Sequence, residues 1–74
     1  MRAPLDLNSI RAVRSLRAGK SPEAVQRELG LSVSGIANIR STYATVSDGL
    51  LARIERVLND RERLKRLISD LLRA

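Results

Sequence analysis

The chain contains no cysteine, histidine, tryptophan or phenylalanine, and Tyr43 is its only aromatic residue. Without cysteine it forms no disulfide and no cysteine-ligated zinc site, and without histidine it lacks the commonest general base and metal ligand. We therefore expect neither an enzyme nor a protein that holds a cofactor. No stretch approaches the roughly 20 apolar residues of a membrane span, and no apolar segment follows Arg2 as in a signal peptide. These absences predict a cytoplasmic protein.

Positive charge is the strongest feature that the composition does have. Fourteen Lys and Arg residues oppose eight Asp and Glu residues, which gives the 74-residue chain a formal net charge of +6 at pH 7. All of these cations except Lys20 and Lys65 are arginine, the side chain best suited to phosphates and base edges. A small basic domain binds nucleic acid, an anionic membrane or an acidic protein, and we favour nucleic acid.

Apolar spacing indicates an all-α fold and shows no pattern typical of strands. It predicts helices over residues 8–18, 22–29 and 32–43, followed by one long helix or two shorter ones over 48–73. Ser21, Pro22 and Gly30 stand where the N-cap, the first turn and the C-terminal stop of the second helix belong. We divide the chain into a helix-turn-helix domain over 1–46 and a C-terminal dimerisation helix over 47–74.

The segment from Ser21 to Arg40, SPEAVQRELGLSVSGIANIR, carries the functional signal. Two short helices meet at Gly30, and Ile36 and Ile39 have the spacing that holds the second of them on a neighbouring helix. This segment resembles the helix-turn-helix modules of bacterial and phage DNA-binding proteins, such as transposases, LuxR-type regulators and ParB-type partition proteins. The resemblance implies a recognition helix that enters the major groove of DNA. Gln26 departs from it, because these families usually have alanine there.

Two groups of residues are candidates for contact with DNA. Those expected to read bases lie on the exposed face of the third helix, and Asn38 is the best of them because its amide pairs bidentately with adenine; they are Ser32, Val33, Ser34, Ala37, Asn38 and Ser41. Those expected to contact phosphates are a cap residue and the cations around the motif: Lys20, Ser21, Arg27, Arg40, Arg2, Arg11, Arg14 and Arg17.

The C-terminal helix has a heptad pattern that is apolar except at Arg61. The pattern leaves two arrangements open: one continuous helix that pairs with a second copy, or two shorter helices separated at Asn59-Asp60. A continuous helix would expose a broad apolar stripe, which favours a homodimer, parallel or antiparallel, or a four-helix bundle. The expected dimerisation residues are Leu50, Leu51, Ile54, Val57, Leu58, Leu64, Leu67, Ile68, Leu71 and Leu72. Acidic residues on the polar face disfavour a membrane surface as the partner.

These observations predict a small dimeric DNA-binding protein that binds double-stranded DNA specifically. We expect a nucleoid-associated transcriptional regulator of a prokaryote, phage or mobile element, without a small-molecule ligand and with a larger protein partner left open. Two alternatives remain. One is a helical adaptor, anti-regulator or assembly factor that binds an acidic protein, and the other is a non-specific DNA-organising or partition factor.

Overall fold

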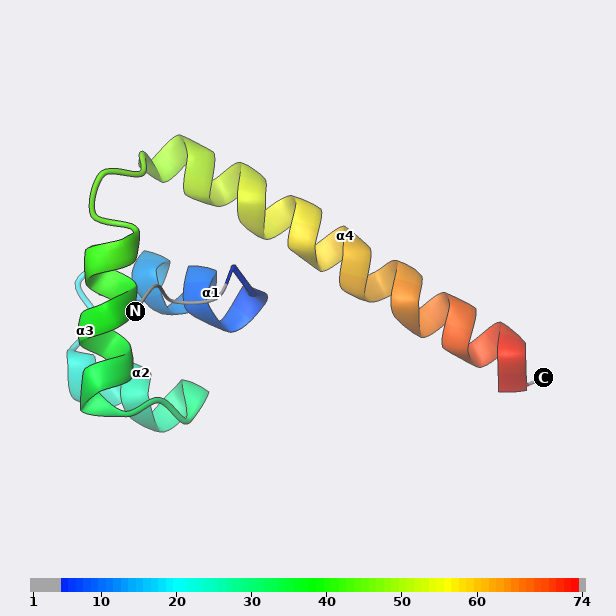
Figure 1. Ribbon diagram of the computed structural model, residues 1–74, viewed down its shortest axis with the longest axis horizontal. Helices are drawn as coiled ribbons and strands as arrows, with labels where there is room; N and C mark the ends of the chain where they lie inside the picture. The colour runs from blue at the N-terminus through cyan, green and yellow to red at the C-terminus, as the bar shows by residue number, and fades with distance from the viewer. Residues whose placement is uncertain (1–4, 74) are drawn as a thin grey trace.

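The computed structural model describes residues 5–73, and this part of the chain is helical with no strand. Helices α1 (Leu7–Arg17), α2 (Pro22–Leu29) and α3 (Val33–Thr42) gather at one end of the molecule, and α4 (Asp48–Arg73) runs past them (Figure 1). The predicted all-α fold is confirmed. Arg2 lies outside the described residues.

Each helix begins at a polar side chain that accepts a main-chain N–H of the first turn. The Asp6 carboxylate accepts the N–H of Ser9 at 2.8 Å. Asp6 is therefore the N-cap of α1, and the helix begins one residue earlier than expected. Serine hydroxyls cap the other three helices through Ala24, Gly35 and Leu50; these serines are Ser21, Ser32 and Ser47.

Helix α1 lies at the centre of the fold, because it packs against each of the other three helices. Its buried residues Ile10, Ala12 and Val13 meet apolar side chains from every other helix in a single cluster, whose remaining members are Val25, Ile36, Ile39, Tyr43 and Leu51. Burial of these aliphatic side chains is the main driving force for folding. Within the described residues, the backbone of α4 comes close to α1 and not to α2 or α3.

Helix α4 is continuous through Asn59 and Asp60, so the two-helix alternative is wrong. The side chain of Asn59 accepts a hydrogen bond from Arg11 at 3.2 Å, which ties this point of α4 to α1. The core also crosses the expected boundary at residues 46–47. Leu51 is fully buried, so it belongs to the core and not to a dimerisation surface.

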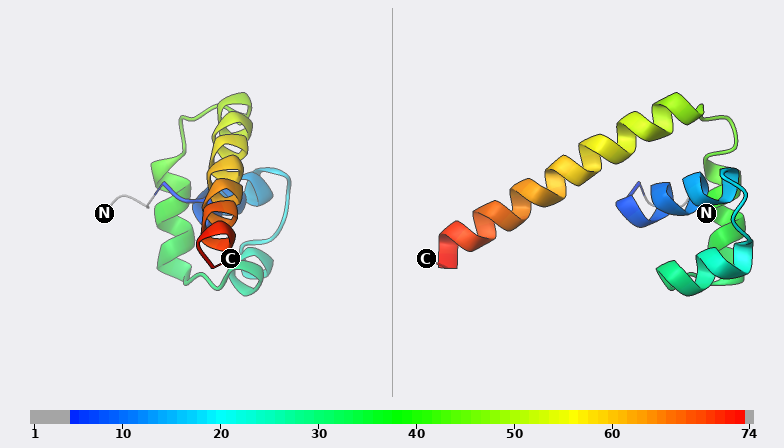
Figure 2. Two further views of the ribbon diagram at one scale, coloured as in Figure 1. Left: turned by 90° about the vertical axis from the view of Figure 1, so that its right-hand side faces the viewer. Right: turned by 180° about the vertical axis from the view of Figure 1, so that it is seen from behind.

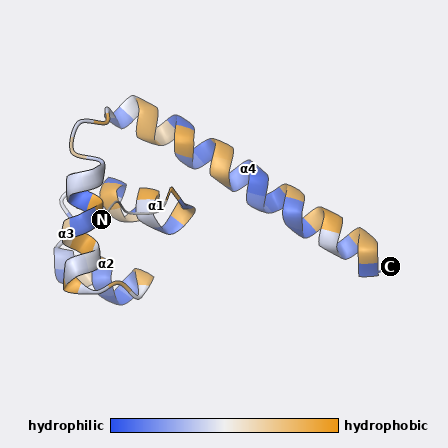
Figure 3. Cartoon of the chain, in the orientation of Figure 1, coloured by the Kyte–Doolittle hydropathy of each residue, from blue (hydrophilic) through white to orange (hydrophobic). Residues whose placement is uncertain are grey.

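Beyond Asn59, α4 leaves the rest of the molecule. All residues from 60 to 73 are exposed, and Figure 1 and the right-hand view of Figure 2 show this half of α4 projecting away from α1, α2 and α3. Apolar residues nevertheless recur along its whole length (Figure 3). No helix within residues 5–73 has both the length and the apolar character to cross a bilayer.

Candidate nucleic-acid interface

A three-residue turn joins α2 to α3, and Gly30 and Gln26 build it. Gly30 adopts a φ of 66°, the left-handed region that favours glycine, and its N–H donates to the carbonyl of Gln26. The same carbonyl accepts the N–H of Leu31 at 3.0 Å, and the Gln26 amide donates to the Leu31 carbonyl at 3.4 Å. Alanine at this position would keep the two bonds to the main-chain carbonyl and would lack only the bond that the Gln26 amide donates.

Helix α3 is anchored through one face. Ile36 and Ile39 are buried in the core with Ile10 and Val13 of α1. Helix α2 also contacts α3 whereas α4 does not, and the face of α3 opposite to Ile36 and Ile39 is largely exposed. This face carries the predicted base-reading residues. All of them are exposed except the half-buried Asn38, and the exposed ones are Ser32, Val33, Ser34, Ala37 and Ser41.

Short side chains make the outer face of α3 narrow. Val33 is 74% exposed at the start of the helix, and its apolar methyl groups have no contact in the core. The Ser32 hydroxyl accepts the N–H of Gly35 at 3.0 Å and lies 3.2 Å from the Ser34 hydroxyl. Ser32 is thus engaged as a helix cap, whereas the amide of Asn38 forms no hydrogen bond within the described chain.

The three arginines of α1 that we expected at phosphates are bound to the α4 side of the molecule. Arg11 donates to Asn59, and Arg14 forms an ion pair with Glu55 at 3.1 Å. Arg17 binds Asp48 at 2.8 Å and two main-chain carbonyls of the segment that precedes α4. Within the isolated chain, this row of arginines therefore fastens α4 to α1.

Two further candidates also have partners. Lys20 forms an ion pair with Glu28 at 2.6 Å, and Ser21 accepts the N–H of Ala24 at 3.2 Å. Both ion-paired groups are partly exposed, so the pair contributes little to stability and opens at small cost. The N-terminal end of α2 is exposed at Ser21, but Glu23 in the first turn of α2 adds a negative charge there.

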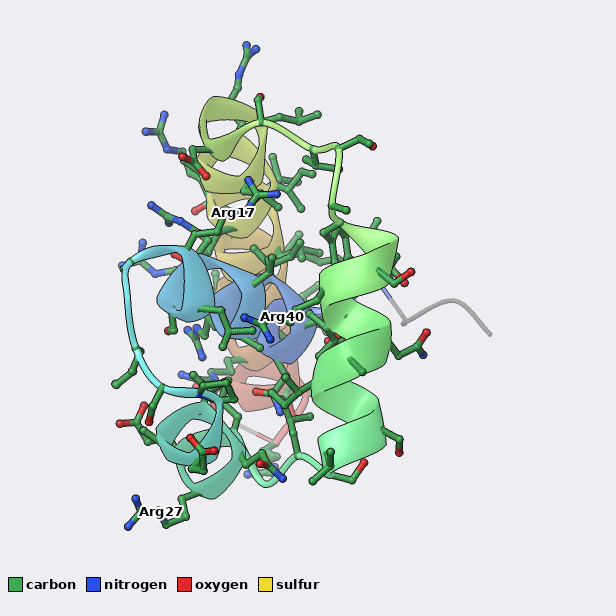
Figure 4. The ribbon with its side chains drawn as sticks, turned by 90° about the vertical axis from the view of Figure 1, so that its left-hand side faces the viewer. Arg17, Arg27 and Arg40 are labelled. Atoms are coloured by element: carbon green, nitrogen blue, oxygen red, sulfur yellow. The ribbon has the colours of Figure 1, made fainter. Side chains whose placement is uncertain are left out.

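Arg27 and Arg40 are the two described cations of α1 to α3 that have no partner within residues 5–73. Figure 4 shows Arg27 extending outward from α2, away from the other labelled arginines. Arg40 extends from α3 across α1 on the side where Arg17 lies (Figure 4), beside a shallow hollow that also includes Val13, Leu16 and Ala44. The helix-turn-helix segment is therefore surrounded by fewer free cations than the sequence indicates.

The chemistry available on this surface is hydrogen bonding and van der Waals contact. Among residues 5–73, no three Asp, Glu, His or Cys side chains come together as a metal site requires. Gln26 in the turn and Arg17 at the carbonyls before α4 are the residues whose roles the sequence did not reveal. A comparison of the chain with protein-family models, curated proteins and solved structures found no match.

Proposed function

We propose that the protein binds double-stranded DNA by placing α3 in the major groove. The observation that carries this proposal is the uncovered outer face of α3, presented by the tight turn at Gly30. A helix of this kind fits the major groove, which is about 12 Å wide. Two apolar anchors, Ile36 and Ile39, hold α3 from behind, so that it meets DNA with little loss of conformational freedom.

The side chains on that face have distinct roles in this proposal. Asn38 reads adenine through its amide, which has no hydrogen-bond partner among residues 5–73 and can form two hydrogen bonds with the base edge. Val33 contacts the methyl group of a thymine, and Ser34 and Ser41 donate to base or phosphate oxygens. Arg27 and Arg40 contact phosphates, because they carry the uncompensated positive charge nearest to α3.

The scarcity of free cations near α3 has a consequence for affinity. Because Arg11, Arg14 and Arg17 already have partners, we assign them to the structure first and to phosphates only where their ion pairs open. Few phosphate contacts give weak non-specific binding, so base contacts and a second copy of the chain supply much of the affinity. In this proposal the protein is a small regulator of a prokaryote, phage or mobile element.

Selection from a pool of random 30-base-pair duplexes, with washes at raised salt, tests the proposal. We expect the full chain to enrich an inverted repeat whose half-sites lie about one helical turn apart. The Asn38→Ala variant should lose the preference at one base pair in each half-site. Retention without an enriched sequence would instead indicate a DNA-organising factor that contacts phosphates alone. No retention would remove the DNA proposal.

The same scarcity of free cations favours a second candidate function. A helical adaptor for an acidic protein needs an exposed basic surface but no groove reader, and α4 carries exposed arginines far from α3: Arg53, Arg56, Arg63 and Arg66. The two functions respond differently to mutation, because the Ser34→Ala and Asn38→Ala changes would leave an adaptor active.

A further inference from the structure

The exposed side of α4 has a regular apolar row with one member in every heptad. Leu50, Val57, Leu64 and Leu71 lie seven residues apart, and all four are exposed. Leu51 lies about 100° further around the helix and is fully buried against α1. Helix α4 therefore turns one face to its own core and a different face outward.

A second row accompanies the first. Ile54, Arg61 and Ile68 follow the first row at the spacing of three and four residues that defines the two seam positions of a coiled coil. Leu67 and Leu72, on either side of this seam, are also exposed and widen it toward the C-terminal end. Near α1 the seam runs into an apolar groove, which is lined by Leu5, Leu50, Arg53, Ile54, Val57 and Leu58.

The molecule exposes more surface than a chain of its size should. Its accessible surface is 5595 Å², whereas a folded monomer of this mass exposes about 4,500 Å². Its radius of gyration of 14.0 Å also exceeds the roughly 11 Å expected for a compact domain of this length. If each of two copies covered the excess of about 1,100 Å², the interface would reach the standard size of roughly 1,600 Å² or more in total.

We propose that α4 pairs in parallel and in register with α4 of a second copy of this chain, as a two-stranded coiled coil. The seam consists of the row at Leu50, Val57, Leu64 and Leu71 together with Arg61 and Ile68. Ile54, the first member of the second row, is partly buried against the core and is not part of this seam, so the core of each copy is unchanged.

Charges beside the seam select the parallel orientation. In a parallel pair, a residue that directly precedes a second-row residue such as Arg61 flanks the seam. On the other helix it meets the residue whose number is larger by five. Asp60 then faces Lys65 of the second copy, and the pair forms twice in the dimer. In an antiparallel pair these two flanking positions lie on opposite sides of the seam, and Asp60 does not reach Lys65. Asp60 has no ion-pair partner within the described chain, and Lys65 has only a long contact of 3.9 Å with Glu62.

Arg61 is the one charged residue of the seam, and it determines the register. A single polar residue at this seam position is typical of two-stranded coiled coils, where it lowers stability but excludes shifted alignments. In the parallel register, Asp60 of the second copy lies beside Arg61 and offsets its charge. A shift by one heptad would place Arg61 opposite Ile54 or Ile68 and leave its charge without that neighbour.

The parallel pair carries both sets of α1 to α3 at the same end, so the two α3 helices belong to one assembly related by a two-fold axis. The pairing rests on α4 and not on the DNA-binding proposal. Its tests use no DNA, so the two proposals fail independently.

Sedimentation equilibrium of the full chain tests the association. We expect a dimer at tens of micromolar for the natural sequence and a monomer for Leu64→Asp. Leu64 is exposed on a part of α4 beyond the core, so this change should leave the cooperative thermal unfolding of the core intact. Ser69→Asp, which adds the same charge on the outward side of α4, should remain a dimer. A natural sequence that is monomeric at 100 micromolar would overturn the proposal.

Single cysteines test the orientation, because the natural chain has none. In the parallel register Leu71 lies opposite itself, so Leu71→Cys should convert most of the protein to a disulfide-linked dimer under mild oxidation. Ser69→Cys should give little of this product. A dimeric Leu71→Cys variant that fails to crosslink would refute the parallel arrangement.

A charge exchange tests the register. Asp60→Lys should weaken dimerisation about tenfold, because two attractions become two repulsions. Adding Lys65→Glu to the same chain should restore most of the loss. If the double variant were as weak as the single one, the pairing of Asp60 with Lys65 would be wrong.

Discussion

The guanidinium of Arg17 donates a hydrogen bond of 2.7 Å to the main-chain oxygen of Tyr43, which lies 26 residues further along the chain. Its second nitrogen donates to the carbonyl of Val46 at 2.6 Å and to the carboxylate of Asp48 at 2.8 Å. The Tyr43 carbonyl, at the C-cap of α3, also accepts the N–H of Val46 at 3.1 Å, so Arg17 adds its hydrogen bonds to a turn that the main chain has already formed between α3 and α4. One side chain of α1 thus holds the segment that positions both later helices.

Replacement of Arg17 should therefore destabilise the fold. We expect Arg17→Ala to lower the free energy of unfolding by roughly 1.5–3 kcal/mol, the range for hydrogen bonds to a charged group. Chemical denaturation followed by circular dichroism measures the change. Arg17→Lys should recover only part of it, because an ammonium group lacks the planar fork that reaches several acceptors together.

Arg14→Ala is the matched control for Arg17. Arg14 lies one turn earlier on α1 and makes a single exposed ion pair with Glu55 at 3.1 Å. Exposed pairs of this kind contribute about 0–1 kcal/mol, so this variant should be nearly as stable as the natural chain. Equal losses in the two variants would mean that Arg17 acts through its charge and not through the carbonyls.

Alkaline pH should weaken the fold through Tyr43. Burial raises the pKa of the Tyr43 phenol, and the negative charge of Asp6 raises this pKa further. Because the folded-state pKa exceeds the unfolded value of about 10, this contribution to stability is complete below pH 10. It is lost as the pH rises through the folded-state pKa.

The absorbance of the phenolate reports this titration without interference, because the chain has one tyrosine and no tryptophan. We expect denaturation midpoints to fall more steeply above about pH 10 for the natural chain than for Tyr43→Phe. Every other ionisable group is common to the two proteins, so the difference between the two curves isolates the phenol. Parallel curves would show that burial does not perturb Tyr43.

Two glycines should respond to alanine in opposite directions. Gly30 has a φ of 66° at the turn between α2 and α3, and a side chain in this conformation costs about 1–2 kcal/mol. Gly49 lies in the first turn of α4, outside the left-handed region, with no atom within 4 Å of an added methyl group. Gly30→Ala should therefore lower the melting temperature, whereas Gly49→Ala should raise stability by up to about 1 kcal/mol. A stabilised Gly30→Ala variant would contradict the observed turn.

The sequence predicted well those elements that local chemistry determines. The bounds of α2 agree with the prediction, because Ser21, Pro22 and Gly30 act on the helix that they adjoin. The continuity of α4 was harder to predict. Asn59 ends a helix about as readily as it continues one, and its bond to Arg11, 48 residues away, depends on how α4 packs on α1.

In the candidate site, too, some features follow from the local sequence and others depend on how the helices pack. The inward residues of α3 follow from helical periodicity, and Ile36 and Ile39 are buried as predicted. The arginines of α1 could not be assigned in that way, because an exposed arginine and one bound to a later helix have the same sequence pattern. Only the packing of α4 brings Asp48 and Glu55 to Arg17 and Arg14.

Asn38 and Arg27 should affect DNA binding differently if α3 is the groove reader. Asn38→Ala removes a bidentate contact to adenine, so it should cost about 1–3 kcal/mol on the selected duplex and almost nothing on an unrelated one. Arg27→Ala removes a phosphate contact, so it should weaken both duplexes equally and lower the slope of log affinity against log salt by about one. Titrations of both duplexes at several salt concentrations separate these effects. Asn38 and Arg27 both lie outside the buried core, so both variants should fold. If only Arg27→Ala lost the discrimination between the two duplexes, specificity would belong to α2 and not to α3.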